Sequence, residues 1–208
     1  MEKYYAIKKA FYLSCIEELE GDYLEFGVFE GSSFCHAIRC YLSKKVYMPM
    51  KEGNHVRFFG FDSFEGFGNL SEDDQHPFYV DEQFKTSYDF VYKKVENLKN
   101  KYSIEASLIK GFLNSTLIDG PQKFNISKAR IIFIDLDLFE PSRDALYFCK
   151  ELIQEGTIII LDDFFSYKGS LNKGVAKAFY NFIDETKYNF REIFSYGMGG
   201  KVFVCNEK

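Results

Sequence analysis

Two uninterrupted apolar runs constrain the fold of this chain more than any other feature. Residues 129–137 have the sequence ARIIFIDLD, and residues 157–162 have the sequence TIIILD. Continuous β-branched runs bounded by glycine or by charge are typical of strands that are buried on both faces. Such strands occur in parallel sheets that are covered by helices on each side. We therefore expect an α/β protein with a mostly parallel sheet.

The remaining segments alternate between strand and helix patterns, which supports this fold class. We expect further strands over residues 23–29, 56–62 and 104–110, and helices over residues 5–19, 33–42, 84–98, 142–153 and 175–185. Residues 190–195 and 201–205, separated by a glycine-rich stretch, predict an antiparallel hairpin that completes a seven-stranded sheet. Residues 43–55 predict an inserted loop.

Composition sets limits on the organisation and partners of the chain. With 208 residues, 46% of them hydrophobic, and no linker-like segment, residues 1–208 predict a single domain, with residues 1–20 as a helix packed on its core. The net charge of −5 gives no reason to expect nucleic acid or an anionic membrane as a partner.

Location is inferred from three further features of the sequence. No apolar run approaches the roughly 20 residues that span a bilayer. The first residues, MEKYY, have no apolar signal core. The five cysteines are scattered without a CxxC pair, which indicates reduced and mostly buried thiols. We expect a cytoplasmic protein.

A glycine loop follows the first predicted strand. Gly27 and Gly31 have the spacing GxxxG, whereas dinucleotide folds use GxGxxG to place a pyrophosphate at a helix N-terminus. Glycine lets the backbone turn tightly and approach a ligand closely, so a ligand without phosphate fits this loop better. The alternative is an ordinary turn between a strand and a helix.

Asp62 ends the next predicted strand, within the sequence FDSFEGF. In Rossmann-like sheets, an acidic residue at this place hydrogen-bonds ribose hydroxyls. The alternative is an aspartate that caps a helix or a turn. The pairing of Asp62 with the glycine loop favours the ribose interpretation.

Carboxylates follow both of the strongest strands. Asp135 and Asp137 end one strand, and Asp162 and Asp163 end the next. Adjacent parallel strands bring these ends together, and unpaired carboxylates repel one another and raise one another's pKa. A divalent cation such as magnesium, calcium or manganese removes that repulsion. The alternative is that some of these residues only cap helices.

Other polar residues receive structural interpretations. His36 is expected to be packed within a helix, whereas His55 and His76 are expected in solvated loops. The acidic run 72–74 is also expected to be a solvated loop face.

The order of these motifs resembles that of the macrocin O-methyltransferase family, which methylates sugar hydroxyls, typically on macrolide antibiotics. The resemblance extends from about residue 6 to the end of the chain. It is carried by residues 25–33, 62–66, 111–112 with 116–117, 134–142, 161–163 and 174–178. It implies a Rossmann-like class I methyltransferase fold and the cofactor S-adenosylmethionine.

The resemblance also implies a set of site residues. The expected cofactor-binding residues are Glu25, Gly27, Glu30, Gly31, Ser32, Ser33, Asp62, Ser63, Gly111, Phe112 and Asp135. The expected metal ligands are Asp135, Asp162 and Asp163, with Mg²⁺ or another divalent cation as the metal. Asp135 and Asp137 are the candidate catalytic residues, and Glu30 is a further candidate contact to the acceptor.

The implied reaction is methyl transfer from the sulfonium to a hydroxyl oxygen. The protein supplies proximity and orientation, and a divalent ion lowers the pKa of a coordinated hydroxyl. A vicinal diol, as in a sugar, is therefore the natural small-molecule acceptor. Asp137, two residues beyond Asp135, is expected to point the same way along the strand and to act as base or substrate contact.

Two other functions compete with this one. Asp135-Leu136-Asp137 superficially matches the DxD motif of haloacid-dehalogenase-like phosphatases, although that motif normally opens the first strand of the domain and here comes about two-thirds along the chain. A non-catalytic S-adenosylmethionine-binding protein is the second alternative.

The chain departs from the usual pattern of this family. Family members usually carry a longer N-terminal segment. They also have a DGD pattern, in which this chain has Leu136 in place of the glycine, and a tyrosine where it has Phe139. These departures leave open the acceptor and whether the chain forms a homo-oligomer.

Overall fold

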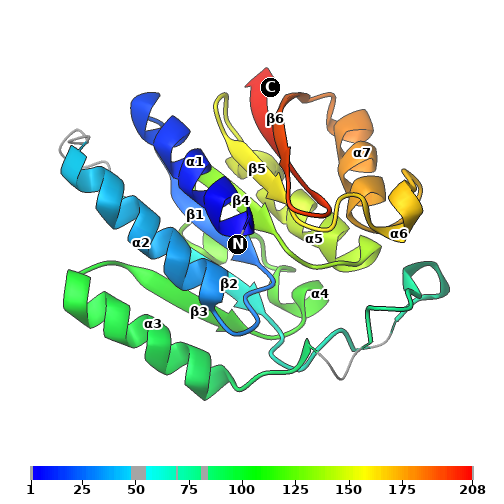
Figure 1. The fold of residues 1–208 in the computed structure, drawn as a ribbon, viewed down its shortest axis with the longest axis horizontal. Coiled ribbons are helices and arrows are strands. Elements are labelled where there is room, and N and C mark those ends of the chain that lie inside the picture. The colour runs from blue at the N-terminus through cyan, green and yellow to red at the C-terminus, as the bar shows by residue number, and fades with distance from the viewer. Residues whose placement is uncertain (1, 48–54, 69, 81–83, 208) are drawn as a thin grey trace.

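A seven-stranded sheet forms the centre of the protein, as seen in a computed structural model that describes residues 2–47, 55–68, 70–80 and 84–207 (Figure 1). The order across the sheet is β3-β2-β1-β4-β5-β7-β6. The strands are β1 (Asp22–Phe26), β2 (Phe58–Asp62), β3 (Ala106–Lys110), β4 (Ala129–Ile134), β5 (Ile158–Leu161), β6 (Asn189–Tyr196) and β7 (Gly200–Glu207).

The first five strands are parallel, and the last two form an antiparallel hairpin. β1 pairs with both β2 and β4, β2 pairs with β3, and β4 pairs with β5. β7 pairs antiparallel with β5 and with β6. The chain therefore changes direction across the sheet between β1 and β4, and such a switch point opens a crevice at the carboxyl ends of the strands. The predicted fold class is confirmed.

Helices cover both faces of this sheet (Figure 1). The α-helices are α1 (Glu2–Ile16), α2 (Ser32–Tyr47), α3 (Tyr88–Tyr102), α4 (Leu113–Thr116), α5 (Phe139–Cys149), α6 (Ser166–Gly169) and α7 (Gly174–Thr186). Short 3₁₀ turns are η1 (Glu72–Asp74), η3 (Pro121–Phe124) and η4 (Lys150–Leu152). Among the described residues, no helix combines the length and the apolar character that a membrane span requires.

Two hydrophobic cores, one on each face, explain the continuous apolar runs. On β4, Ile131 and Phe133 belong to the core beneath α1, α2 and α3. Their neighbours Ile132 and Ile134 belong to the core beneath α5 and α7. Successive side chains of a strand point to opposite faces, so a strand covered on both sides has apolar residues at most of its positions.

Several element boundaries differ from the expectations. The first helix, α1, begins at Glu2 and not at residue 5, and β4 ends at Ile134, three residues before the expected end. Helix α2 extends to Tyr47, so the predicted inserted loop is helical at its start, and residues 48–54 lie outside the described residues. All five cysteines are described, all are buried, and none forms a disulfide, in agreement with the prediction of reduced thiols.

Candidate active site

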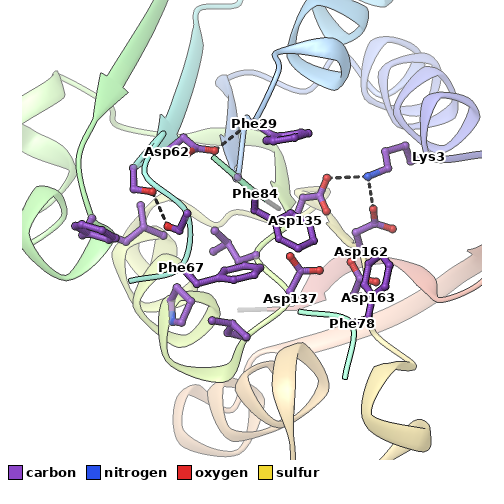
Figure 2. Close-up of a pocket in the computed structure, with 18 residues that line it drawn as sticks. Lys3, Phe29, Asp62, Phe67, Phe78, Phe84, Asp135, Asp137, Asp162 and Asp163 are labelled. Atoms are coloured by element: carbon purple, nitrogen blue, oxygen red, sulfur yellow. Dashed lines mark hydrogen bonds and ion pairs between the residues drawn. The ribbon is translucent and has the colours of Figure 1, made fainter. Parts of the chain in front are cut away.

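A cavity of about 340 Å³ opens at the carboxyl ends of β1, β2, β4 and β5 (Figure 2). Its lining combines carboxylates, loop backbone and a group of phenylalanines. The lining residues are Lys3, Gly27, Phe29, Asp62, Ser63, Gly66, Phe67, Phe78, Phe84, Phe112, Leu113, Asp135, Leu136, Asp137, Leu138, Pro141, Asp162 and Asp163.

The two glycines of the predicted loop are required by contacts within the protein. Gly27 has a φ of +89°, and a Cβ placed there would lie 1.8 Å from the backbone oxygen of Asp135. Gly31 has a φ of +75°, and its Cβ would lie 2.7 Å from a methyl carbon of Val91 on α3. The sequence interpretation assigned these glycines to close approach of a ligand. The structure shows that the loop is pressed against β4 and α3, although Gly27 does line the cavity.

Asp62 ties the glycine loop to the end of β2. Its Oδ2 accepts hydrogen bonds from the backbone N–H groups of Val28 and Phe29, each at 2.7 Å, and its Oδ1 accepts one from Phe64 at 2.6 Å (Figure 2). Burial raises the pKa of Asp62, and these backbone donors oppose that rise. A carboxylate oxygen has two lone pairs, so Oδ1 retains an acceptor position, and Asp62 lines the cavity.

Glu25 lies behind the cavity wall and does not line it. Its side chain is fully buried, with Oε1 accepting from the Ser33 hydroxyl at 2.6 Å and Oε2 from the Tyr23 hydroxyl at 2.5 Å. Burial raises the pKa of Glu25 to about 7, and the two hydroxyl donors hold it below a still higher value. Glu25 thus anchors the first turn of α2 beneath the glycine loop.

The other predicted cofactor residues divide into two groups. Ser63 and Phe112 line the cavity, and the hydroxyl of Ser63 donates to the carbonyl of Gly66 at 2.7 Å. The other four residues do not line the cavity, and they are Glu30, Gly31, Ser32 and Gly111. Glu30 on the loop and Ser32 at the start of α2 are exposed.

Three aspartates converge at the ends of β4 and β5. One carboxylate oxygen each from Asp135, Asp162 and Asp163 lies within 4.8 Å of the others. Oxygen donors in this number suit a hard divalent ion, and magnesium typically uses few protein carboxylates and keeps positions for water or substrate. The donor set therefore fits the cation that the sequence predicts.

Asp137 reaches the cavity by a route other than the one expected. β4 has already ended, and Asp137 has a left-handed backbone with a φ of +62°. The expectation that it points inward by strand alternation is therefore wrong. A tight turn, and not the pleat, brings it to the cavity, where its side chain is 8% exposed.

Burial and mutual repulsion make the acidic cluster costly to ionise. Burial raises the pKa of Asp135 well above its usual value, as does the charge of Asp162, whereas Lys3 acts in the opposite direction. Burial also raises the pKa of Asp137, together with the charges of Asp163 and Asp135. A neighbouring cation is therefore strongly favoured at this site.

Lys3, on the first turn of α1, supplies one such cation. Its Nζ lies 2.9 Å from Oδ2 of Asp135 and 2.6 Å from Oδ2 of Asp162 (Figure 2). Burial alone would lower the pKa of Lys3, but these two carboxylates outweigh it and raise the pKa. Sequence reasoning did not identify Lys3, because nothing near it in the chain distinguishes it from the other lysines. Only the docking of α1 shows its role.

A network of two hydroxyl groups contacts Asp163. The Tyr79 hydroxyl donates to Oδ1 of Asp163 at 3.1 Å and pairs with the hydroxyl of Ser166 at 2.5 Å. Tyr79 is 4% exposed, and it comes from the long connection between β2 and α3. The same connection contributes Phe67, Phe78 and Phe84 to the cavity, and none of these aromatic residues was predicted as part of the site.

The acidic run in this connection includes a buried residue. Asp74 is 2% exposed, and its Oδ1 accepts from the backbone N–H of Phe139 at the start of α5 at 2.7 Å. The prediction of a solvated face is therefore wrong for Asp74. His76 is partly buried, with its ring 4.3 Å from that of Tyr79, whereas His55 is exposed and His36 is packed against α1, as expected.

Comparison with known proteins gives the family. The family model for macrocin-O-methyltransferase (TylF) matches residues 4–189. The chain belongs to the macrocin O-methyltransferase family. It is therefore an S-adenosylmethionine-dependent O-methyltransferase, as the sequence predicted. No curated protein sequence gives a significant match.

Solved structures of methyltransferases share the fold of this chain. The O-methyltransferase NovP superimposes with a TM-score of 0.76 at 18% identity, covering 98% of this chain and 79% of NovP. The calicheamicin methyltransferase CalS11 gives 0.72 at 20% identity, covering 95% and 76%. An O-methyltransferase from Bacillus cereus in complex with SAH gives 0.55 at 14% identity, covering 96% and 80%.

Proposed function

We propose that this methyltransferase transfers its methyl group to a sugar hydroxyl that is held, with a neighbouring hydroxyl, at a divalent ion. The observation that carries the proposal is the convergence of Asp135, Asp162 and Asp163 within one cavity that also contains the glycine loop and Asp62. A cofactor site and a hard-cation site share one wall there. We further propose that the ion is magnesium.

The cavity divides into two parts of different chemistry. One part has Gly27, Asp62, Ser63 and Phe112, which surround the loop at the end of β1 and suit the ribose and base of the cofactor. The other part has the acidic cluster and the phenylalanines of the β2–α3 connection. Asp135 lies at the junction of the two, so the reacting methyl group and the acceptor oxygen would meet beside it.

The chain's own residues have three tasks in this reaction. The backbone and Asp62 hold the cofactor so that its methyl group faces the acceptor, because orientation can supply a large part of the rate acceleration in such a displacement. The partly buried Phe67 and Phe84, which line the cavity, limit the access of water to it. Asp137, with its raised pKa, is placed to take the proton of the acceptor hydroxyl. A bound divalent ion would supply Lewis acidity, lowering the pKa of that hydroxyl.

Related structures support a sugar acceptor. CalS11 is described as TDP-rhamnose 3'-O-methyltransferase, an enzyme in calicheamicin biosynthesis, and its apo structure superimposes on this chain with a TM-score of 0.62 at 19% identity. A sugar carries the adjacent hydroxyls that two open positions of an octahedral ion accept. This chemistry is the reason for proposing a vicinal diol.

Removal of the cation site tests the proposal. Asp162→Asn should abolish methyl transfer to a nucleotide sugar or glycoside, while calorimetry shows nearly unchanged S-adenosylmethionine affinity, because the ion serves the acceptor. Excess chelator should have the same effect on the parent protein, and Mg²⁺ should restore transfer. Asp184→Asn, at an exposed carboxylate on α7, is the matched control and should keep full activity. Full turnover in excess chelator would rule out the ion.

A further inference from the structure

The position of Lys3 leads to an inference about how the cation site is filled. Lys3 Nζ contacts Oδ2 of Asp135 and Oδ2 of Asp162 at 2.9 and 2.6 Å. These two residues also belong to the three-carboxylate cluster that could hold a metal ion. Figure 2 shows the ammonium between the two carboxylates, on the side of the cluster that faces α1.

An ammonium at this position disfavours a divalent ion at the same carboxylates. Magnesium binds carboxylate oxygens at about 2.0–2.1 Å and requires near-octahedral geometry. To reach oxygens from both Asp135 and Asp162, the ion must enter the space beside the Lys3 ammonium. Two cations at contact distance also repel each other strongly where burial limits screening.

We propose that the Lys3 ammonium is a built-in competitor of the divalent ion, occupying the cation position of the carboxylate cluster until the ion displaces it. This inference rests on the proposed function, because it concerns the same ion. It assigns to Lys3 the control of when the cluster accepts metal, and it makes the ammonium the cluster's counter-charge when no ion is bound.

The side chain can leave without any movement of the helix. The residues around Lys3 are fixed, with the Glu2 carboxylate accepting from the Gly197 N–H, the Tyr4 carbonyl pairing with His36 Nε2 at 2.9 Å, and Ala6 fully buried. The Lys3 side chain itself is 37% exposed. Its flexible four-carbon stem can therefore carry the ammonium into solvent while α1 stays docked.

If the Lys3 ammonium competes with the divalent ion, removing its charge should make the protein bind metal more tightly. Lys3→Met keeps most of the stem and removes the charge. Titration of the full chain with Mn²⁺, followed by electron paramagnetic resonance of the free ion, should show affinity increased by about 5- to 150-fold, the range typical of coupled sites. Lys3→Arg, which keeps the charge, should retain weak binding. Lys8→Met, at an exposed position on the same helix, is the matched control and should bind Mn²⁺ as the parent does.

Thermal unfolding gives a second readout that does not depend on activity. In chelator, Lys3→Met should unfold at a lower temperature than the parent, because the buried carboxylates lose their counter-charge. Mg²⁺ should then raise the midpoint of Lys3→Met by more degrees than that of the parent. Adding Asp162→Asn to Lys3→Met should abolish the gain in Mn²⁺ affinity, which would place the ion in the cluster.

Three results would overturn the inference: unchanged or weaker Mn²⁺ binding by Lys3→Met, an equal gain in Lys8→Met, or no Mn²⁺ binding by any of these chains. The proposed function fails on a different result, namely methyl transfer that persists in chelator. Metal-independent transfer together with tighter Mn²⁺ binding by Lys3→Met would leave the competition standing without the catalytic role of the ion.

Discussion

At the scale of single residues, Gly27 has a conformation and a neighbour that together exclude a side chain. Gly169 offers a matched comparison, because its φ of +72° is also positive but nothing lies within 4 Å of a Cβ there. A left-handed backbone costs an L-residue about 1–2 kcal/mol, so Gly169→Ala should lower the free energy of unfolding by that amount.

Gly27→Ala should be more damaging, because it adds a collision to the same backbone strain. Its Cβ would lie 1.8 Å from the carbonyl oxygen of Asp135. Forcing atoms into a packed site costs about 1–3 kcal/mol further, or more. Urea unfolding of both variants measures the difference. Equal stabilities would show that the loop can move away from β4, and that the glycine serves the ligand alone.

The role of a residue could be predicted from the sequence only where the residues around it form a recognisable local pattern. The aspartates follow unmistakable buried strands, so their convergence could be predicted from the parallel sheet. Gly27 and Asp62 were predicted from the sequence as cofactor-binding residues, and both line the cavity, but their contacts with the carbonyl of Asp135 and the N–H groups of Val28 and Phe29 depend on the tertiary structure. Lys3 had no local signal, since it meets Asp135 across 132 residues of sequence.

At the scale of elements, α5 begins without a capping side chain of its own. The residue before it, Leu138, makes no side-chain hydrogen bond to the helix. The free N–H of Phe139 instead donates to Asp74, which lies in η1 and is 65 positions away in the sequence. Asp74 also accepts from the Ser71 hydroxyl at 2.9 Å through Oδ2. One carboxylate therefore joins the β2–α3 connection to the helix that follows Asp137.

Loss of the Asp74 carboxylate should destabilise both α5 and the β2–α3 connection. Asp74→Ala should lower the free energy of unfolding by about 1–2 kcal/mol, the usual effect of removing a helix cap. Glu72→Ala, at an exposed position in the same turn, should change it little. Chemical denaturation compares the two variants. A fully stable Asp74→Ala would mean that water replaces the carboxylate at Phe139.

Elements were easier to predict than their ends. The core strands combine β-branched composition with continuous burial, so both their existence and their order in the chain followed from the sequence. Helix limits were displaced at α1 and α3; α3 begins after Ser87, whose hydroxyl accepts from the N–H of Phe90, and ends before Ser103, which has a left-handed backbone. The β2–α3 connection gave no periodic signal, because its Tyr79 and Asp74 are buried by contacts with α5 and α6 and not by a repeating pattern.

At the scale of the whole molecule, the free energy of unfolding should depend on pH through Glu25, which does not line the cavity. Glu25 is fully buried in β1, with a pKa of about 7 compared with the usual 4.5. The folded protein therefore keeps this proton to a higher pH than the unfolded chain does. It follows that the free energy of unfolding decreases as pH rises from about 4.5 to about 7.

Glu25→Gln should remove this part of the pH dependence. Between about pH 4.5 and pH 7, the free energy of unfolding of the parent protein should decrease by about 3 kcal/mol, since each pKa unit corresponds to about 1.4 kcal/mol. Glutamine does not titrate, so the variant should lose correspondingly less, and the difference between the two proteins isolates Glu25 from the aspartate cluster. Glu105→Gln, at an exposed position, should follow the parent. Urea unfolding at pH 5 and pH 8 measures the effect. An unchanged decline in Glu25→Gln would mean that Glu25 ionises as easily when folded as when unfolded, and that the burial of β1 does not govern its charge.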